Sequence, residues 1–353
     1  MDDFFEFLKK NKKFVDSIIK KHVPEKWDDK YLEWLLGKPS YTYDSVALTK
    51  SLAEPMWDFL NRGGKRWRPV MFLLFTEALG GNMEKASDIA IIPELVHEGS
   101  IMVDDVEDLG EMRRGKPCTH KIFGVDIAIN TGNMMYYIPL IILIKNIPKL
   151  DDETRLRMYN IYTQEMINLS AGQAMDIWWH KGKASNVTEK QYMQMCAYKT
   201  GTLARMAARL AVALSKGTDE QEEKIGKIAE TFGVAFQIHD DILSATSKEF
   251  SDKKGYGDDI TEGKRSLMVV HALHHASKEE RSELLSILDS HTRDKEKIDR
   301  AIEILVNTGS VEHAKKTAKE IMSNAWEGAN VIPDSPAKKN IKRLVDYLIE
   351  RTI

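Results

Sequence analysis

Residues 95–108 read LVHEGSIMVDDVED, an apolar segment that runs directly into a cluster of carboxylates. In a helix, Asp104 and Asp108 lie one turn apart on the same face. Carboxylates at that spacing repel each other, so a helix that carries them near its end requires a compensating cation. Magnesium takes oxygen ligands and commonly bridges one or two carboxylates to substrate phosphates. The stretch therefore predicts a helix with a magnesium site at its end. The alternative, a solvated acidic face, fits the preceding apolar residues less well.

A second stretch repeats this pattern: residues 232–244 read FGVAFQIHDDILS, again an apolar segment that ends in paired aspartates, Asp240 and Asp241. Two such clusters can face each other across a helical bundle and hold metal ions between them. A pair of matching acidic clusters is also much harder to attribute to chance than a single one. Metal-assisted chemistry on a phosphorylated substrate is the interpretation that we favour.

Four basic stretches complete the charged pattern: GGKRWRP at 63–69, RRGK at 113–116, KTG at 199–201 and GKR at 263–265. Taken singly, each is more typical of a solvated surface. Together with the carboxylate pairs they indicate two diphosphate groups, one bound through metal and one bound directly by arginine and lysine.

The remaining sequence predicts an all-α fold. Apolar residues recur at helical spacing, as in Leu203, Met206 and Leu210, and alternating β-branched runs between turn pairs are nearly absent. Ordinary helix lengths give about ten to fourteen helices. Glycine-containing breaks such as 79–82, 181–183, 215–217 and 307–309 are expected helix ends. We expect residues 1–60 to form a helical N-terminal arm that packs on a catalytic bundle of residues 61–353, one domain overall.

Composition excludes several other classes of protein. Lys and Arg (51) nearly balance Asp and Glu (54), so the net charge of −3 gives no reason to expect nucleic acid as a partner. The two cysteines, Cys118 and Cys196, are too few for a disulfide framework or a cysteine-based zinc site. The longest apolar run, Ile138–Ile144, is too short to cross a bilayer. We expect a cytoplasmic protein without a transmembrane segment.

Six motifs, in order and spacing, resemble the trans-isoprenyl diphosphate synthase (polyprenyl synthetase) family, and geranylgeranyl diphosphate synthases most. They are GGKRWRP at 63–69, DDVEDLGEMRRGKPCTHKIFG at 104–124, GQAMD at 172–176, YKTG at 198–201, FQIHDDIL at 236–243 and GDDITEGKRSL at 257–267. The resemblance covers residues from about 60 to 270. It implies a single large helical bundle of the isoprenoid synthase type with the active-site cavity in its centre, and a homodimer.

The resemblance also implies a role for each matching residue. Three Mg²⁺ ions would be bound by the aspartate motifs, with Asp105 and Asp241 in supporting roles: Asp104, Asp105, Asp108, Asp240 and Asp241. Isopentenyl diphosphate would be bound by Lys65, Arg68, His97 and Arg114. The allylic diphosphate (dimethylallyl, geranyl or farnesyl) would be bound by Arg113, Lys199, Gln173, Asp176, Lys254 and Lys264. The catalytic group near the developing cation would comprise Lys199, Thr200, Gln237 and Lys264.

Two positions depart from the family pattern. Ser244 stands where a third aspartate is usual, which puts the strength of the third metal site in doubt. Asp258 stands where a lysine is common, and Lys254 is a candidate to replace that charge in part.

Chain length is expected to depend on the residues one turn before the first aspartate motif, Gly99 and Ser100. The resemblance implies that the growing chain runs alongside that helix, so small residues there would leave room for a C20 product. The alternative is that Gly99 permits close helix packing. Geranylgeranyl diphosphate is therefore the expected product, a longer prenyl chain the second choice and farnesyl diphosphate the third.

Three competing interpretations remain. A class I terpene cyclase has a second motif of the form (N/D)DxxSxxxE, which Asp240 to Ser244 begins to match. However, Lys248 occupies the glutamate position. Such an enzyme would also leave the basic stretches at 63–69 and 113–116 without a substrate. A non-catalytic synthase subunit would be expected to lack motif aspartates, which the first motif retains. A helical scaffold with surface charges does not explain six ordered motifs.

Overall fold

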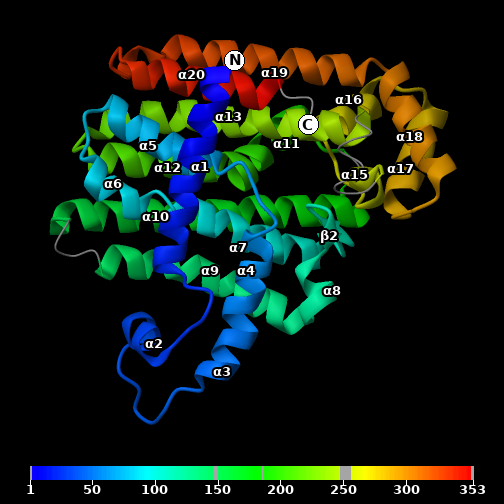
Figure 1. The fold of residues 1–353 in the computed structure, drawn as a ribbon. Helices are drawn as coiled ribbons and strands as arrows, with labels where there is room; N and C mark the ends of the chain where they lie inside the picture. Colours follow the sequence, from blue (N-terminus) through cyan, green and yellow to red (C-terminus); the bar gives the residue numbers. More distant parts are fainter. Residues whose placement is uncertain (1, 146–149, 185, 247–255, 351–353) are drawn as a thin grey trace. The chain divides into compact units, whose positions relative to one another are not determined.

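The structure is a computed structural model that describes residues 2–145, 150–184, 186–246 and 256–350. These residues are almost entirely helical (Figure 1), which confirms the predicted all-α class. The chain divides into two compact units. Unit 1 comprises Met1–Ile161, Ala207–Thr218 and Asp334–Ile341, and unit 2 comprises Tyr162–Met206, Asp219–Pro333 and Lys342–Ile353. The predicted division into an arm and a catalytic bundle stays a prediction.

Unit 1 is built from the N-terminal helices and one short hairpin. Its elements are α1 (Asp2–His22), α2 (Asp29–Leu36), α3 (Ser45–Leu48), the π-helical turn η1 (Thr49–Ala53), α4 (Glu54–Leu60), α5 (Trp67–Ala78), α6 (Met83–Ile89), α7 (Ile92–Glu107), β1 (Met112–Arg113), β2 (Lys116–Pro117), α8 (Thr119–Phe123) and α9 (Val125–Lys145). Three helices have residues in both units: α10 (Asp152–Trp178), α12 (Thr202–Leu214) and α20 (Pro336–Glu350).

Unit 2 contains the later helices. They are η3 (Trp179–Lys183), α11 (Glu189–Cys196), η4 (Ala197–Gly201), α13 (Asp219–Thr246), α15 (Asp258–Thr261), α16 (Leu267–His275), α17 (Lys278–Asp289), α18 (Lys295–Asn307), α19 (Ser310–Glu327) and η5 (Gly328–Val331). The described part of the chain thus holds more helices than the ten to fourteen expected, because several, such as α3 and α15, have only four residues. The predicted helix ends at 79–82, 215–217 and 307–309 are confirmed.

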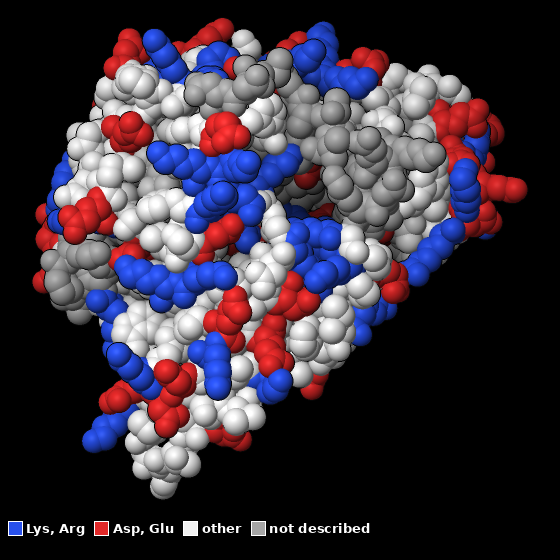
Figure 2. All heavy atoms as spheres, in the orientation of Figure 1, with Lys and Arg blue, Asp and Glu red and all other residues white. Residues whose placement is uncertain are grey.

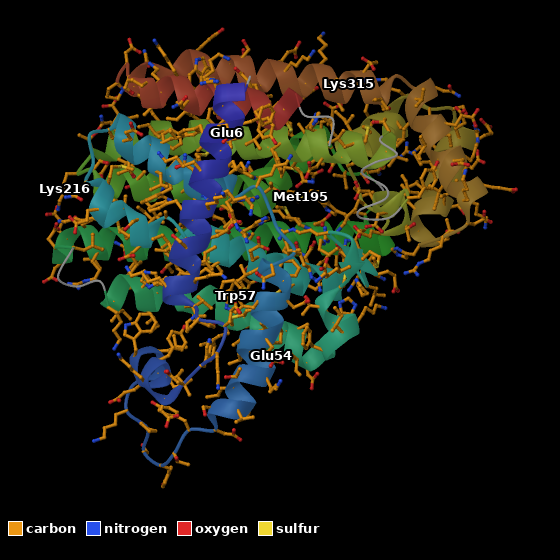
Figure 3. All side chains as sticks on the ribbon, viewed as in Figure 1. Glu6, Glu54, Trp57, Met195, Lys216 and Lys315 are labelled. Atoms are coloured by element: carbon orange, nitrogen blue, oxygen red, sulfur yellow. The ribbon has the colours of Figure 1, made fainter. Side chains whose placement is uncertain are left out.

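The core of unit 1 joins the N-terminal region to the helix that carries the first acidic motif. Val15 and Trp27 are buried in the same cluster as Leu95 and Met102 of α7. Trp57 of α4, labelled in Figure 3, donates from Nε1 to the carbonyl of Val23, 3.0 Å away. The N-terminal helices therefore help to hold α7 in place.

Helices α7 and α9 lie side by side (Figure 1), and glycines bring their backbones into contact. A Cβ atom on Gly99 would lie 2.7 Å from the carbonyl oxygen of Gly132 and 2.8 Å from Cβ of Met135. Real Cβ atoms essentially never come that close. The space beside Gly99 is thus filled by α9, which is the alternative of close helix packing. A residue larger than glycine at position 99 would therefore collide with α9.

In unit 2, glycines likewise allow close backbone contact where α13 meets the π-helical turn η4. A Cβ atom on Gly233 would lie 2.6 Å from Cα of Gly201, and one on Gly172 would lie 2.7 Å from the carbonyl carbon of Tyr198. Single π-helical turns of this kind are frequent at functional sites. Here the turn holds Lys199 and Thr200 close to α10 and α13.

The surface carries no strong excess of either charge on the face that Figure 2 shows, where Lys and Arg side chains are intermixed with Asp and Glu. Among the described helices, α9 alone is long and apolar enough to cross a membrane, by length and composition only. Its most apolar 18-residue window is 44% buried inside the protein, as expected for a helix that packs against α7. The predicted absence of a transmembrane segment stays a prediction.

Candidate active site

The first acidic motif lies at the C-terminal end of α7. Asp108 caps the helix, and its backbone N–H donates to the carbonyl of Asp104 (2.8 Å), so the two residues are one turn apart as predicted. Both side chains are half-buried. The last turn of α7 contains no basic residue, although a helix C-terminus carries partial negative charge and disfavours carboxylates. This costly placement of Asp104 and Asp108 favours a cation as their partner.

Asp105 points the other way. Its side chain is fully buried, and its Oδ1 accepts a hydrogen bond from Nε of Arg113, 2.8 Å away. Burial and this negative charge also raise the pKa of the nearby Cys118 thiol to about 12. Asp105 therefore holds the Arg113 side chain in position from within the core. This placement does not support the expected metal contact through Asp105.

Arg113 and Arg114 lie on a β-hairpin that the sequence analysis did not predict. Met112 pairs with Pro117 and Arg113 with Lys116, and the connecting residues Arg114 and Gly115 have φ of 55° and 76°. Two-residue hairpin turns with positive φ at both positions match the twist of paired strands. Gly115, directly after Arg113 and Arg114, was the one sequence feature that could have predicted this turn.

Arg66 is the structural centre of the basic loop 63–69, a role that sequence reasoning missed. Its side chain is 3% exposed. It donates to Asp16 of α1 (2.9 Å), to Glu94 (3.0 Å) and to Glu98 (2.5 Å). Its backbone takes the left-handed conformation, φ 51°, just before α5 begins. Arg66 therefore links α1, α7 and the basic loop, and it turns the chain into α5.

Arg68 is buried, and no carboxylate among the described residues forms a salt bridge with it. The side chain is 4% exposed, its guanidinium lies over the ring of Trp67 at 4.3 Å, and its Nε has no hydrogen-bond partner among the described residues. Burial lowers the pKa of Arg68 to about 10, opposed by Glu94 and Glu98. A buried cation without a bonded partner is costly, so Arg68 is suited to an anionic ligand.

Two more of the predicted residues surround Arg68. Arg114 donates to the carbonyl of Gly63 (2.6 Å) and to Glu98. Burial, with the charges of Arg68 and Arg114, holds the pKa of His97 well below its ordinary value, so His97 is neutral at neutral pH. The structure thus brings Arg68, His97 and Arg114 together in unit 1, and Lys65 lies in the same loop.

In unit 2, Asp176 connects two predicted lysines that are far apart in sequence. Its Oδ2 accepts from Nζ of Lys199 (2.6 Å) and of Lys264 (2.9 Å). Burial alone would raise the pKa of Asp176, but the two lysines hold it well below its ordinary value. Asp176 therefore stays ionised and keeps two cationic side chains together. Gln173, three residues earlier on α10, is half-buried.

The second acidic motif lies near the C-terminal end of α13. Asp240 is half-buried, whereas Asp241 is 8% exposed and turned inward. Both Asp241 oxygens accept hydrogen bonds within unit 2, from Tyr192 (2.8 Å) and Gln237 (2.8 Å). This geometry supports Asp240 as the metal-facing residue and gives Asp241 a different task. Lys254 lies outside the described residues, as does Lys248.

Ser244 is 5% exposed, unlike the half-buried Asp240 one turn earlier. We expect Ser244→Ala to change turnover less than about threefold, and Asp240→Ala to lower it by about 10²-fold, the scale for removing one electrostatic stabiliser. Steady-state assays of both variants, with and without isopentenyl diphosphate, check this. Equal damage from the two substitutions would restore Ser244 as a metal ligand of the terpene cyclase type.

The described residues contain no cluster of three His, Cys, Asp or Glu side chains that forms a ready metal cage. Magnesium does not need one, because it is usually bound by one or two carboxylates together with substrate phosphates. The half-buried pair Asp104 and Asp108 at the end of α7 fits that requirement, as does the half-buried Asp240.

A mainly helical fold with two aspartate motifs, and with groups of cationic side chains in unit 1 and in unit 2, is the arrangement expected of a helical enzyme that acts on diphosphates. A model of the polyprenyl synthetase family matches residues 49–305, and the chain belongs to this family. It is a prenyltransferase.

Relatives and solved structures agree with this assignment. The chain is 34% identical to a short chain isoprenyl diphosphate synthase of Methanothermobacter thermautotrophicus, over 83% of this chain and 88% of that protein. It is 33% identical to a geranylgeranyl pyrophosphate synthase of Metarhizium anisopliae, over 89% and 92%. The crystal structure of geranylgeranyl pyrophosphate synthetase from Pyrococcus horikoshii superposes with a TM-score of 0.84 at 29% identity, covering 99% of each chain.

Proposed function

We propose that the protein condenses isopentenyl diphosphate with an allylic diphosphate and makes geranylgeranyl diphosphate, the C20 product, in a magnesium-dependent reaction. Relatives named geranylgeranyl pyrophosphate synthase support the product. Magnesium is supported by the placement of Asp104 and Asp108. The Corynebacterium glutamicum geranylgeranyl pyrophosphate synthase, which shares the fold at 20% identity, was crystallised with isoprenyl diphosphate and magnesium. A cytoplasmic homodimer is part of the proposal.

The observation that carries the proposal is the buried guanidinium of Arg68. A terpene cyclase binds one diphosphate and has no use for a second anion site. In unit 1, Arg68 and Arg114 surround a neutral His97, which is a set of donors suited to a diphosphate. We assign isopentenyl diphosphate to these residues together with Lys65.

The remaining site residues bind the allylic diphosphate and magnesium. Lys199 and Lys264, held together by Asp176, bind the allylic diphosphate, together with Arg113 and Gln173. Magnesium, when bound by Asp104, Asp108 and Asp240, neutralises charge on the departing diphosphate. We propose three such ions in each active site.

The reaction then needs no side-chain nucleophile. The bond between the allylic carbon and its diphosphate oxygen breaks, and the electron pair leaves with the diphosphate, which the lysines stabilise. The alkene of isopentenyl diphosphate forms the new carbon–carbon bond with the allylic cation. A proton leaves the neighbouring carbon for the released diphosphate. Exclusion of water protects the cation from hydrolysis.

Replacement of Arg68 tests the second diphosphate site. We expect Arg68→Met to raise KM for isopentenyl diphosphate at least about tenfold, because a hydrogen bond to a charged group contributes about 1.5–3 kcal/mol. KM for the allylic diphosphate should stay nearly constant. Arg281→Met, in α17 of unit 2, is the control and should change neither constant. Equal effects on both substrates would contradict the assignment.

Chain length is tested at Ser100 and not at Gly99, because a side chain at Gly99 would collide with α9. Ser100 is half-buried, and its hydroxyl donates to the carbonyl of His97 in its own helix. We expect Ser100→Phe to shorten the main product to C15 without abolishing condensation, since an aromatic ring occupies a large volume. Gly99→Phe should instead destabilise the protein. Product sizing and thermal unfolding of both variants separate the two effects.

A further inference from the structure

A chain of hydrogen bonds in unit 2 connects the buried Tyr192 to two residues of the proposed catalytic group. Tyr192 of α11 is 1% exposed, and its hydroxyl donates to Oδ2 of Asp241 (2.8 Å). Nε2 of Gln237 donates to Oδ1 of the same carboxylate (2.8 Å). Oε1 of Gln237 in turn accepts from the hydroxyl of Thr200 (2.7 Å). None of the motifs in the sequence includes Tyr192.

The chemistry of these groups fixes the direction of every hydrogen bond in the chain. The tyrosine hydroxyl is the donor and Oδ2 of Asp241 the acceptor in the first hydrogen bond. The Gln237 amide presents its nitrogen to Oδ1 of Asp241, and an amide nitrogen only donates. The amide oxygen therefore faces Thr200, and Thr200 must donate its single hydroxyl hydrogen to it.

This direction determines what Thr200 and Gln237 can offer to a substrate. With its hydrogen committed to Gln237, the Thr200 oxygen has only lone pairs left. The Gln237 carbonyl likewise has only a remaining lone pair. Two acceptors without an outward hydrogen stabilise a neighbouring positive charge, whereas an outward hydroxyl hydrogen would repel it.

We propose that Tyr192 is a positioning residue that acts through Asp241 and Gln237 to keep Thr200 presenting lone pairs toward the developing allylic cation. The inference rests on the proposed function. Without the tyrosine hydroxyl, Asp241 loses the hydrogen bond that Tyr192 donates to it, and the amide of Gln237 is held less firmly. The hydroxyl of Thr200 then loses its fixed direction. Because phenylalanine fills the same space as tyrosine, the hydroxyl can be removed without emptying the core.

The test is a double-mutant cycle on the full-length protein. We expect Tyr192→Phe to lower kcat about tenfold, less than the loss of about 10²-fold typical for a group that contacts the reacting atoms. KM for both diphosphates should stay nearly constant. In a Thr200→Val background, the same substitution should cost less than about twofold, because the two residues act through one chain. An unchanged kcat in Tyr192→Phe, or a full tenfold loss in the Thr200→Val background, overturns the proposal.

A binding measurement separates this role from metal binding. Calorimetric titration of Mg²⁺ with inorganic pyrophosphate should give nearly the same affinity for wild type and Tyr192→Phe. A large loss of affinity in the variant would mean that Tyr192 serves a metal site at Asp241, and it would overturn the proposal.

A matched control is Tyr31→Phe. The Tyr31 hydroxyl donates to the carbonyl of His22 (2.8 Å) in unit 1, so this variant removes a comparable hydroxyl outside the proposed site. Its kcat should equal that of wild type. A wild type that makes no prenyl diphosphate would refute the proposed function itself. An active wild type with an unaffected Tyr192→Phe variant would refute only the positioning role.

Discussion

Replacement of Asp104 by alanine is expected to lower turnover by about 10²-fold or more, while the protein keeps its fold. Asp104 and Asp108 lie in the last turn and cap of α7, where the helix dipole already disfavours negative charge. The substitution removes one of two carboxylates that we assign to magnesium, and removal of a single electrostatic stabiliser typically costs about 10²- to 10³-fold. Because the placement is intrinsically costly, the variant should also unfold at an equal or slightly higher temperature.

Steady-state turnover at several magnesium concentrations checks this result, with thermal unfolding measured in parallel. Asp152→Ala is the matched control: that side chain is 95% exposed at the start of α10 and should be dispensable. If Asp104→Ala retains more than about half of the activity, the metal assignment is wrong.

Among the variants proposed here, Arg66→Met should cause the largest loss in the free energy of unfolding. Arg66 is 3% exposed and bound to Asp16, Glu94 and Glu98, and the side chain of Glu98 is itself fully buried. Removal of one partner from a buried ion pair leaves an uncompensated charge and costs about 3–5 kcal/mol. Turnover per folded molecule should fall too, because the loop that carries Arg68 loses its anchor on α1 and α7.

Arg300→Met provides the contrast. Arg300 also contacts three carboxylates, Glu280, Glu283 and Glu303, but on the surface of unit 2. Exposed pairs are screened by water and contribute little. Denaturant unfolding of both variants should show a large drop for Arg66→Met and almost none for Arg300→Met. Comparable losses would show that burial is not what makes the Arg66 cluster important.

The parts of the fold and site that could be predicted from sequence are those encoded locally. Helical periodicity predicted the all-α class, and the spacing of Asp104 and Asp108 predicted their common face on α7. Glycine-containing breaks predicted helix ends. Each of these depends on residues within one or two turns of each other.

What could not be predicted depends on contacts between distant segments. Arg66 was one cation among several in its loop, and only the approach of α1 and α7 reveals it as buried. Tyr192 and Asp241 are 49 residues apart in the sequence, and no sequence motif predicts the hydrogen bond between them. The space beside Gly99 was expected to be open, but α9 fills it. A glycine in the sequence does not show whether the space beside it stays open or is filled by a neighbouring helix.

The most direct test of the account is product analysis with labelled isopentenyl diphosphate. The purified protein is incubated with the label, magnesium and, in turn, dimethylallyl, geranyl or farnesyl diphosphate, and the products are sized. We predict a labelled C20 diphosphate that forms only when both substrates and magnesium are present. Release of an unlabelled hydrocarbon from the allylic diphosphate alone, or no incorporation of label with any primer, would contradict the account.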